Sequence, residues 1–371
     1  MITKIELINF KCYEKRSFDI SNLTIFCGNN SVGKSTAIQA LAVPFQSNFV
    51  EKVLLNGELV SLGTISDVLS HHSKSSTLRI SLEFDIKKKF KCTWGFDDEN
   101  EQSLLRNHLN KKSHETESQL LSDNYFKNNR FQFLQAERFG PRSYLENSHN
   151  ESISSWLGSK GEYVYEVITE IDKSGLRLDN NDKRLLKKDE GPSVRRNIIN
   201  WMSEISPGFN FESDTVSEAG ISHAQFQAYG SKKTTPPNMG FGLSYSLSIV
   251  CALLITKPGG LVVIENPEAH LHPRGQSYLG RLIARAALAG VQVIIETHSD
   301  HLLNGIRVAA RLENDYEEGL FKVYFVSGEY NKESTAEEIN IGTKGELSMW
   351  PKGFFDQQAI DVKTLMKGVE I

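Results

Sequence analysis

The residues from Gly28 to Thr36 constrain the fold more than any other feature of this chain. They spell GNNSVGKST, a complete match to the pattern G-x-x-x-x-G-K-[ST], and they follow the short apolar run Leu23–Cys27. Glycines let the backbone wrap so closely that successive N–H groups point inward at an anion. A helix beginning near Lys34 would add the positive end of its dipole. The sequence therefore predicts a strand, a phosphate-binding loop and a helix, in that order.

Every residue of this loop is predicted to contact a nucleotide. The Lys34 side chain would bring positive charge to the β- and γ-phosphates, and the Ser35 hydroxyl would ligate Mg²⁺. ATP and Mg²⁺ are therefore the expected cofactors. The predicted binding residues of the loop are Gly28, Asn29, Asn30, Ser31, Val32, Gly33, Lys34, Ser35 and Thr36.

Such a loop needs an acidic partner at the end of a neighbouring strand, and the run Leu261–Glu265 supplies one. Glu265 is predicted to hold Mg²⁺ through water. Asn266 follows at the place where many relatives of this motif carry a carboxylate that polarises the attacking water. An amide can orient water but cannot accept its proton. Two alternatives follow: slow hydrolysis, or a base supplied by Glu268 while Asn266 positions the water.

Another apolar run, Val291–Ile295, is followed by the residues ETHSDH. A histidine at the carboxyl edge of a parallel strand can reach the γ-phosphate and report its presence, and His298 is predicted to do so. His301 is assigned to the following helix, with a structural role. His270 and His272 have a spacing that favours an ordered turn over a metal site.

Apolar strands alternate with helices at both ends of the chain, which predicts a parallel sheet covered on both faces. We expect three segments: residues 1–50 with the phosphate-binding loop, residues 51–235 as an inserted lobe that also supplies part of the main sheet, and residues 236–371 with the acidic strand and His298. The predicted fold class is α/β, with a mixed sheet and an inserted α+β lobe.

Local patterns predict individual elements within these segments. The polar stretch Asp97–Asn129 is expected to be a loop or lightly packed helices. The other predicted elements are a helix over Lys34–Ala42 that stops ahead of Pro44, antiparallel strands over Thr77–Phe84 and Lys89–Phe96, and amphipathic helices over Ile153–Ile171, Val194–Ile205 and Arg274–Ala289.

Composition places the 371-residue chain among ordinary globular proteins, with 39% hydrophobic and 24% charged residues. It has no apolar run of about 18 residues and no signal peptide at its beginning, so we expect a cytoplasmic protein. Its four cysteines are widely separated, and we expect them to be reduced thiols. A net charge of −4 offers no bulk attraction to nucleic acid. Local basic clusters, at 87–91, 183–188 and 195–196, are either solvated surface or contacts to a phosphate backbone.

Three stretches together resemble ABC-type ATPases of the SMC, RecF and OLD (overcoming lysogenization defect) group. They are Ile5–Ser35, IENPEAHLHP at 264–273 and ETHSDHLLNGIR at 296–307. In that family a signature segment contacts the γ-phosphate held by the opposite subunit. The resemblance places this segment at 238–246 and implies that Gly240, Gly242 and Ser244 bind nucleotide across a homodimer or higher homo-oligomer. Small residues that open a helix can approach an anion closely.

The tail SMWPKGFFDQ at 348–357 is similar to the ends of OLD-like ATPases from bacterial defence loci. OLD proteins themselves carry a TOPRIM nuclease domain after the ATPase, but only about sixty residues follow the helix of His301 here. The resemblance therefore implies a separate effector partner, such as a nuclease. Nucleic acid is a further candidate partner, and a membrane is not.

Two hypotheses for function follow from these observations. The first is an ATP-hydrolysing dimer switch in an anti-phage defence or DNA-processing complex. The second is a structural scaffold that binds ATP and hydrolyses it negligibly, which Asn266 favours. A self-contained nuclease is a third interpretation, disfavoured because the sequence shows no TOPRIM acids.

Overall fold

The computed structural model describes residues 1–49, 53–73, 75, 77–96, 106–107, 111–128, 130–148, 155–330 and 332–368. The strands in this part of the chain are β1 (Ile2–Phe10), β2 (Tyr13–Asp19), β3 (Leu23–Gly28), β4 (Leu78–Ile86), β5 (Lys88–Phe96), β6 (Arg106–Asn107), β7 (Phe131–Leu134), β8 (Tyr144–Glu146), β9 (Asn210–Val216), β10 (Ile221–Gln227), β11 (Leu261–Glu265), β12 (Gln292–Glu296), β13 (Phe321–Ser327) and β14 (Thr335–Asn340). The α-helices are α1 (Lys34–Gln46), α2 (Ile65–Val68), α3 (Lys111–Tyr125), α4 (Val164–Ser174), α5 (Val194–Ile205), α6 (Phe241–Ile255), α7 (Pro273–Leu288), α8 (Asp300–Leu312) and α9 (Gln357–Lys367).

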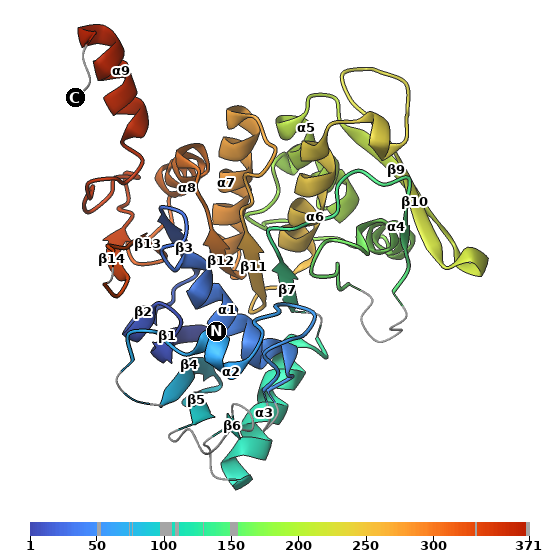
Figure 1. The fold of residues 1–371 in the computed structure, drawn as a ribbon. Helices are drawn as coiled ribbons and strands as arrows, with labels where there is room; N and C mark the ends of the chain where they lie inside the picture. The colour runs from blue at the N-terminus through green and yellow to red at the C-terminus, as the bar shows by residue number, and fades with distance from the viewer. Residues whose placement is uncertain are drawn as a thin grey trace.

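A six-stranded sheet in the order β14-β13-β3-β12-β11-β7 forms the centre of the molecule (Figure 1). All neighbours in it are parallel except β13 and β14, which are antiparallel. The predicted α/β class with a mixed sheet is therefore confirmed. The order places β12 between β3 and β11. The carboxyl ends of β11 and β12, which lead into the predicted catalytic residues, therefore lie beside the phosphate-binding loop at the end of β3.

Both faces of the central sheet are buried, as the continuous apolar strands predict. Leu261 and Val263 of β11 pack into one core cluster together with α1. Val262 and Ile264 of the same strand pack into a second cluster that includes α6, α7 and α8. Successive side chains of a strand point to opposite faces, so one short strand contributes to both cores.

A second sheet, β2-β1-β4-β5-β6, lies on the far side of α1 and is antiparallel (Figure 1). The two antiparallel strands predicted around 77–96 are confirmed, and Lys87, with φ 60°, makes the turn between them. The helix expected to stop ahead of Pro44 instead continues to Gln46. Phe45 and Phe49 are fully buried among other aromatic rings, and this packing offsets the missing proline N–H.

The remaining sheet, β8-β10-β9, packs with α4 and α5. The predicted helix Val194–Ile205 is confirmed as α5. The helix predicted over Ile153–Ile171 begins only at Val164, because Gly158 and Gly161 take positive φ values of 80° and 76° and turn the chain before it. Residues 151–154 lie outside the described residues. Part of the polar stretch 97–129 forms α3, and residues 97–105 and 108–110 are likewise outside the description.

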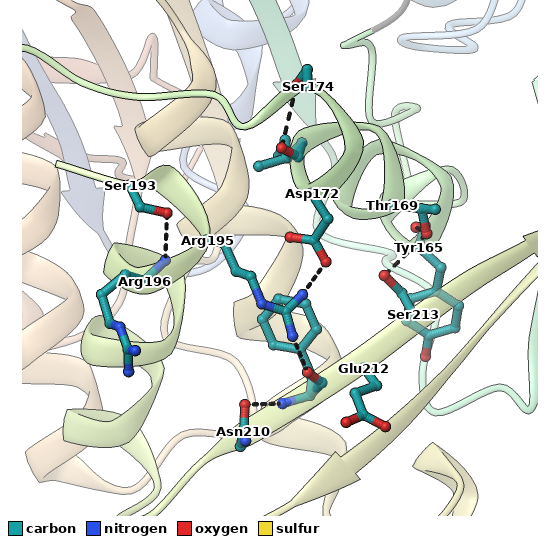
Figure 2. A network of polar contacts seen from close by, with 12 residues as sticks. Tyr165, Thr169, Asp172, Ser174, Ser193, Arg195, Arg196, Asn210, Glu212 and Ser213 are labelled. Atoms are coloured by element: carbon teal, nitrogen blue, oxygen red, sulfur yellow. Dashed lines mark hydrogen bonds and ion pairs between the residues drawn. The ribbon is translucent and has the colours of Figure 1, made fainter.

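Arg195 of α5 connects this helix to α4 and β9, as Figure 2 shows. Its guanidinium forms an ion pair with Asp172 of α4 and donates a hydrogen bond to the Phe211 carbonyl of β9 over 2.7 Å. The guanidinium also lies 4.7 Å from the centre of the Phe211 ring. One side chain of α5 therefore binds a helix and a strand at once.

Several other residues of the basic clusters bind acidic groups of the same chain. Lys183 contacts Glu313 at 3.0 Å and Asp315 at 2.7 Å. Arg184 is buried and pairs with Asp182 at 2.7 Å. For Arg184 neither interpretation from the sequence holds, because it is buried and paired; Lys183 is partly exposed, in keeping with a solvated surface. No helix in the described part of the chain is long and apolar enough to cross a membrane.

Candidate nucleotide-binding site

The predicted loop joins β3 to α1 and leaves the start of that helix open. Gly33 is the N-cap residue, with φ 101°, and no side chain caps the first turn. The Thr36 N–H donates to the Gly33 carbonyl over 3.2 Å, whereas no side chain occupies the N–H groups of Lys34 and Ser35, which can therefore bind an anion. Gly28 has φ 136°, and a Cβ there would lie 2.0 Å from the Val326 carbonyl oxygen, so only glycine fits.

The Lys34 side chain folds back over the loop. Its ammonium donates to the Asn29 carbonyl over 2.5 Å and lies 3.9 Å from the Glu296 carboxylate. Burial lowers the pKa of Lys34, and the nearby Glu296 opposes this shift. The ammonium is thus held at the mouth of the loop without a short ion pair, which suits a group that has to bind phosphate.

The Ser35 hydroxyl donates to Oε1 of Glu296 over 3.0 Å. Glu296 was assigned no role from the sequence, although it follows an apolar strand just as Glu265 does. That shared pattern is the signal that could have identified it. Only 5% of Glu296 is exposed, and burial raises its pKa.

Glu265 lies one strand further from the loop, paired in register with Glu296. Its Oε2 accepts a hydrogen bond from the Ala136 N–H over 3.0 Å, and burial raises its pKa. The role of Glu265 in holding Mg²⁺ stays a prediction.

Arg138 is a second residue that the sequence did not reveal. It is buried, and its guanidinium donates to the carbonyls of Glu265 at 2.7 Å and Asn266 at 2.8 Å. The guanidinium also lies 5.2 Å from the centre of the Tyr245 ring. Burial lowers the pKa of Arg138 to about 10, so the group remains charged at neutral pH. Arg138 therefore fixes the chain where the acidic strand ends and connects it to α6.

Asn266 sits in this fixed segment with φ 45°, a conformation that asparagine tolerates better than most residues. Its backbone N–H donates to the Glu296 carbonyl over 2.9 Å. Its side-chain Oδ1 is buried and has no hydrogen-bond partner in the described part of the chain. A buried amide oxygen without a partner fits a residue that positions a water molecule.

Glu268 contacts the segment that follows β12. One carboxylate oxygen accepts from the Thr297 hydroxyl at 2.8 Å, and the other accepts from the His298 N–H at 2.6 Å. The His298 side chain is exposed, and desolvation and the charge of Lys34 lower its pKa. Glu268 and His298, two predicted catalytic residues, are thus in direct contact through a backbone hydrogen bond. Their catalytic roles stay predictions.

Two cavities flank the loop, and His298 lines both. One, of about 340 Å³, is lined by Cys12, Glu296 and loop residues from Asn30 to Thr36. The other, of about 430 Å³, lies between Gly28–Asn30 and the tail residues Gly353–Gln357. Residues 240–246 line neither of these two cavities.

The predicted signature segment forms the beginning of α6, with Gly240 as its N-cap. Gly240 and Phe241 are exposed. Gly242 packs so closely on the turn after β11 that a Cβ there would lie 2.6 Å from the His270 carbonyl oxygen. His270 contacts Tyr245 edge-on, and His272 caps α7, accepting from the Arg274 N–H at 3.3 Å. These two histidines thus belong to the turn between β11 and α7, which packs against the start of α6.

The residues at the loop fit Mg²⁺ together with a triphosphate. No three acidic, histidine or cysteine side chains in the described ranges converge into a ready-made metal site. Mg²⁺ is usually bound through one or two carboxylates, waters and phosphate oxygens rather than a protein cage. The Ser35 hydroxyl, the two strand-end carboxylates and the open helix N-terminus provide that type of site.

Comparison with known proteins supports this description of the fold. The chain is similar to the Smc head bound to the C-terminal winged-helix domain of ScpA, with 15% identity, a TM-score of 0.56, and coverage of 91% of this chain and 97% of that one. It is also similar to the Smc head with an extended coiled coil bound to the C-terminal domain of ScpA derived from Pyrococcus furiosus, with 13% identity, a TM-score of 0.57 and 99% coverage of both chains. These likenesses show that the fold is that of an SMC-type ATPase head.

Family models cover most of the sequence. No curated protein matches it. Residues 321–365 match a family described as a protein of unknown function, DUF3696. Residues 23–304, which include the loop, β11, β12 and His298, match the family described as AAA domain, putative AbiEii toxin, Type IV TA system. The chain therefore belongs to this family of AAA ATPase domains.

Proposed function

We propose that this protein binds and hydrolyses ATP and acts as a nucleotide-driven switch between two copies of the chain. The observation that carries the proposal is the uncapped start of α1, with the Lys34 ammonium folded over the loop. A helix N-terminus and a lysine placed in this way can hold the phosphates of a nucleotide, and the sequence pattern of the loop is the one that does so for ATP.

Each residue around the loop has a distinct part in this proposal. The amides of 28–36 would hold the phosphates, and Lys34 would move from the Asn29 carbonyl to the β- and γ-phosphates. Ser35 and Glu265 would hold Mg²⁺, which neutralises phosphate charge when bound. Asn266 would orient water through its unpartnered Oδ1, and Glu268 would hold the segment of His298 or act as the base.

A second copy would complete the site. Residues 240–246 line neither cavity at the loop of their own chain, and Gly240 and Phe241 are exposed. An exposed helix N-terminus can approach a phosphate bound to another subunit. Closure of two copies would then depend on the γ-phosphate, and the exposed His298 would sense it.

We further propose an OLD-like role in anti-phage defence or DNA processing, with a separate effector such as a nuclease. The family description, which names a putative toxin, supports a defence context. The two Smc heads were each solved with a bound ScpA domain, which makes a partner protein a reasonable expectation for this fold.

The alternative is a scaffold that binds ATP and hydrolyses it negligibly. Asn266 favours it, because no carboxylate occupies the position directly after Glu265. In the described structure both oxygens of the nearest candidate base, Glu268, accept hydrogen bonds.

Calorimetric titration with Mg-ATP, together with a phosphate-release assay, tests the proposal. We expect saturable binding by the wild type, loss of binding in Lys34→Ala, and turnover above the Lys34→Ala background. Binding with turnover equal to that background would support the scaffold. No binding by a folded wild-type sample would refute both. Incubation with DNA and Mg²⁺ or Mn²⁺ tests for a nuclease activity of the chain itself.

A further inference from the structure

Glu296 is the carboxylate in direct contact with the phosphate-binding loop. Its Oε1 accepts a hydrogen bond from the Ser35 hydroxyl over 3.0 Å and lies 3.9 Å from the Lys34 ammonium. Glu265, the predicted Mg²⁺ residue, instead accepts from the Ala136 N–H on the side of β7. The two residues that follow the loop's last glycine therefore both face Glu296.

Strand order explains this arrangement. β12 lies directly beside β3, and β11 lies beyond β12. Neighbouring strands are about 4.8 Å apart, so Glu265 starts roughly 10 Å from the strand that leads into the loop, and Glu296 starts at half that distance. In-register pairing brings Glu296 level with Glu265 and with Phe26, two residues before the end of β3. A side chain of glutamate length then reaches Ser35.

We propose that Glu296 positions the Ser35 hydroxyl for Mg²⁺ and makes nucleotide binding depend on the metal. This inference rests on the proposed ATP-binding function. When the hydroxyl donates its hydrogen bond to Glu296, the lone pairs of Ser35 Oγ point away from that carboxylate and are free to ligate a cation. The same carboxylate repels a triphosphate that arrives without a cation.

The surroundings of Glu296 strengthen both effects. Little water reaches it, since only 5% of the residue is exposed, so its charge is weakly screened. Glu265 and Glu268 lie near enough to add to the negative potential at Glu296. Lys34 offsets part of this potential while the loop is empty. Once Lys34 turns to a phosphate, a divalent cation beside Ser35 would balance the carboxylates.

The decisive variant is Glu296→Gln, which keeps the size and an oxygen acceptor but removes the charge. ATP affinity is measured by calorimetry in Mg²⁺ and again in EDTA, and Mn²⁺ affinity of the ATP-loaded protein by electron paramagnetic resonance. We expect weaker binding with metal, tighter binding in EDTA, and Mn²⁺ affinity lower by about 10- to 100-fold, the range seen when a residue that orients a metal ligand is lost.

Two further variants test whether Glu296 acts through Ser35. Ser35→Ala should lower Mn²⁺ affinity by itself, and Glu296→Gln should add little to it in the double variant, because coupled residues are not additive. Glu318→Gln, an exposed carboxylate just before β13, is the matched control and should leave both affinities unchanged. Thermal melts of all four proteins check that they fold.

Other results would overturn the inference. One is a Glu296→Gln protein, folded by its melt, with unchanged affinities in Mg²⁺ and in EDTA. The other is strict additivity of the Ser35→Ala and Glu296→Gln effects. A wild-type protein that binds no ATP in either buffer would overturn the proposed function itself. This failure is distinct from a failure of the Glu296 inference, because it is seen in the unsubstituted protein.

Discussion

The His298 backbone N–H donates a hydrogen bond to Glu268 over 2.6 Å, so the turn after β11 directly holds the segment after β12. The second oxygen of the same carboxylate accepts from Thr297. Hydrogen bonds to an ionised carboxylate are among the stronger ones in proteins. Glu268 is therefore placed to fix the segment that carries the predicted γ-phosphate sensor.

We expect Glu268→Gln to lower ATP turnover by about 100-fold while ATP affinity stays near that of the wild type, because misplacing a catalytic group by about 1 Å can have this effect. Phosphate release and calorimetry measure the two quantities. The exposed Glu318→Gln is a control of the same chemistry. If Glu268 is instead the base, its replacement would also remove the acidic limb of the pH–rate profile; a positioning role leaves that limb in place.

Asn266→Asp should raise turnover by about 10- to 100-fold, since it places a potential base where the amide now lies. Aspartate tolerates the positive φ of 45° at this position, whereas a longer side chain would be more strained. Phosphate-release rates of Asn266→Asp and Asn266→Ala would be compared. An Asp variant no faster than the wild type would show that the missing carboxylate does not limit hydrolysis.

Arg195→Met should destabilise the fold by about 1–2 kcal/mol, because it leaves Asp172 without its cation and frees the Phe211 carbonyl. Partial exposure of both side chains keeps the effect below that of a fully buried pair. The exposed neighbour Arg196→Met is the matched control on α5 and should change stability little. Urea unfolding at neutral pH measures both. Equal effects of the two variants would show that the contacts of Arg195 with Asp172 and Phe211, drawn in Figure 2, do not stabilise the fold.

The effect of Arg195→Met should shrink in acid. Burial raises the pKa of Asp172, and the Arg195 charge opposes that rise. A carboxyl whose folded pKa is raised favours the folded state below its unfolded pKa, and this contribution is lost as pH rises through the folded pKa. Removing Arg195 raises the folded pKa further, so the variant loses most at neutral pH. Unfolding between pH 7 and pH 4 should show the two proteins converging as Asp172 becomes protonated.

The sequence predicted β3, β4, β5, β11, β12, the loop and α5 well because each depends on a local pattern: apolar runs, glycine spacing or helical periodicity. It assigned no strand to β8, β9, β10, β13 or β14. It could not order the strands, and that order is what brings Glu296 rather than Glu265 to Ser35. Arg138 was missed because its partners at the site, the Glu265 and Asn266 carbonyls, are more than a hundred residues away, which no spacing rule reveals. The extension of α1 through Pro44 likewise depends on aromatic packing between distant segments.

Two inactive variants should restore activity when mixed, if the site is shared between copies. Lys34→Ala removes the lysine of the loop but leaves residues 240–246 intact. Gly240→Glu places a negative charge where the partner's phosphate would approach, and it should fold, because nothing lies within 4 Å of a Cβ there and an acidic side chain suits a helix N-terminus.

Each variant alone should show only background turnover, and Gly240→Glu should still bind ATP. In an equal mixture half of the dimers are mixed, and each mixed dimer has one site with both parts intact, so about a quarter of wild-type turnover should return if pairing is random. Gly240→Ser, which is small and neutral, should stay active alone. A mixture that remains at background, although cross-linking shows mixed dimers, would mean that residues 240–246 do not complete the site of a second copy.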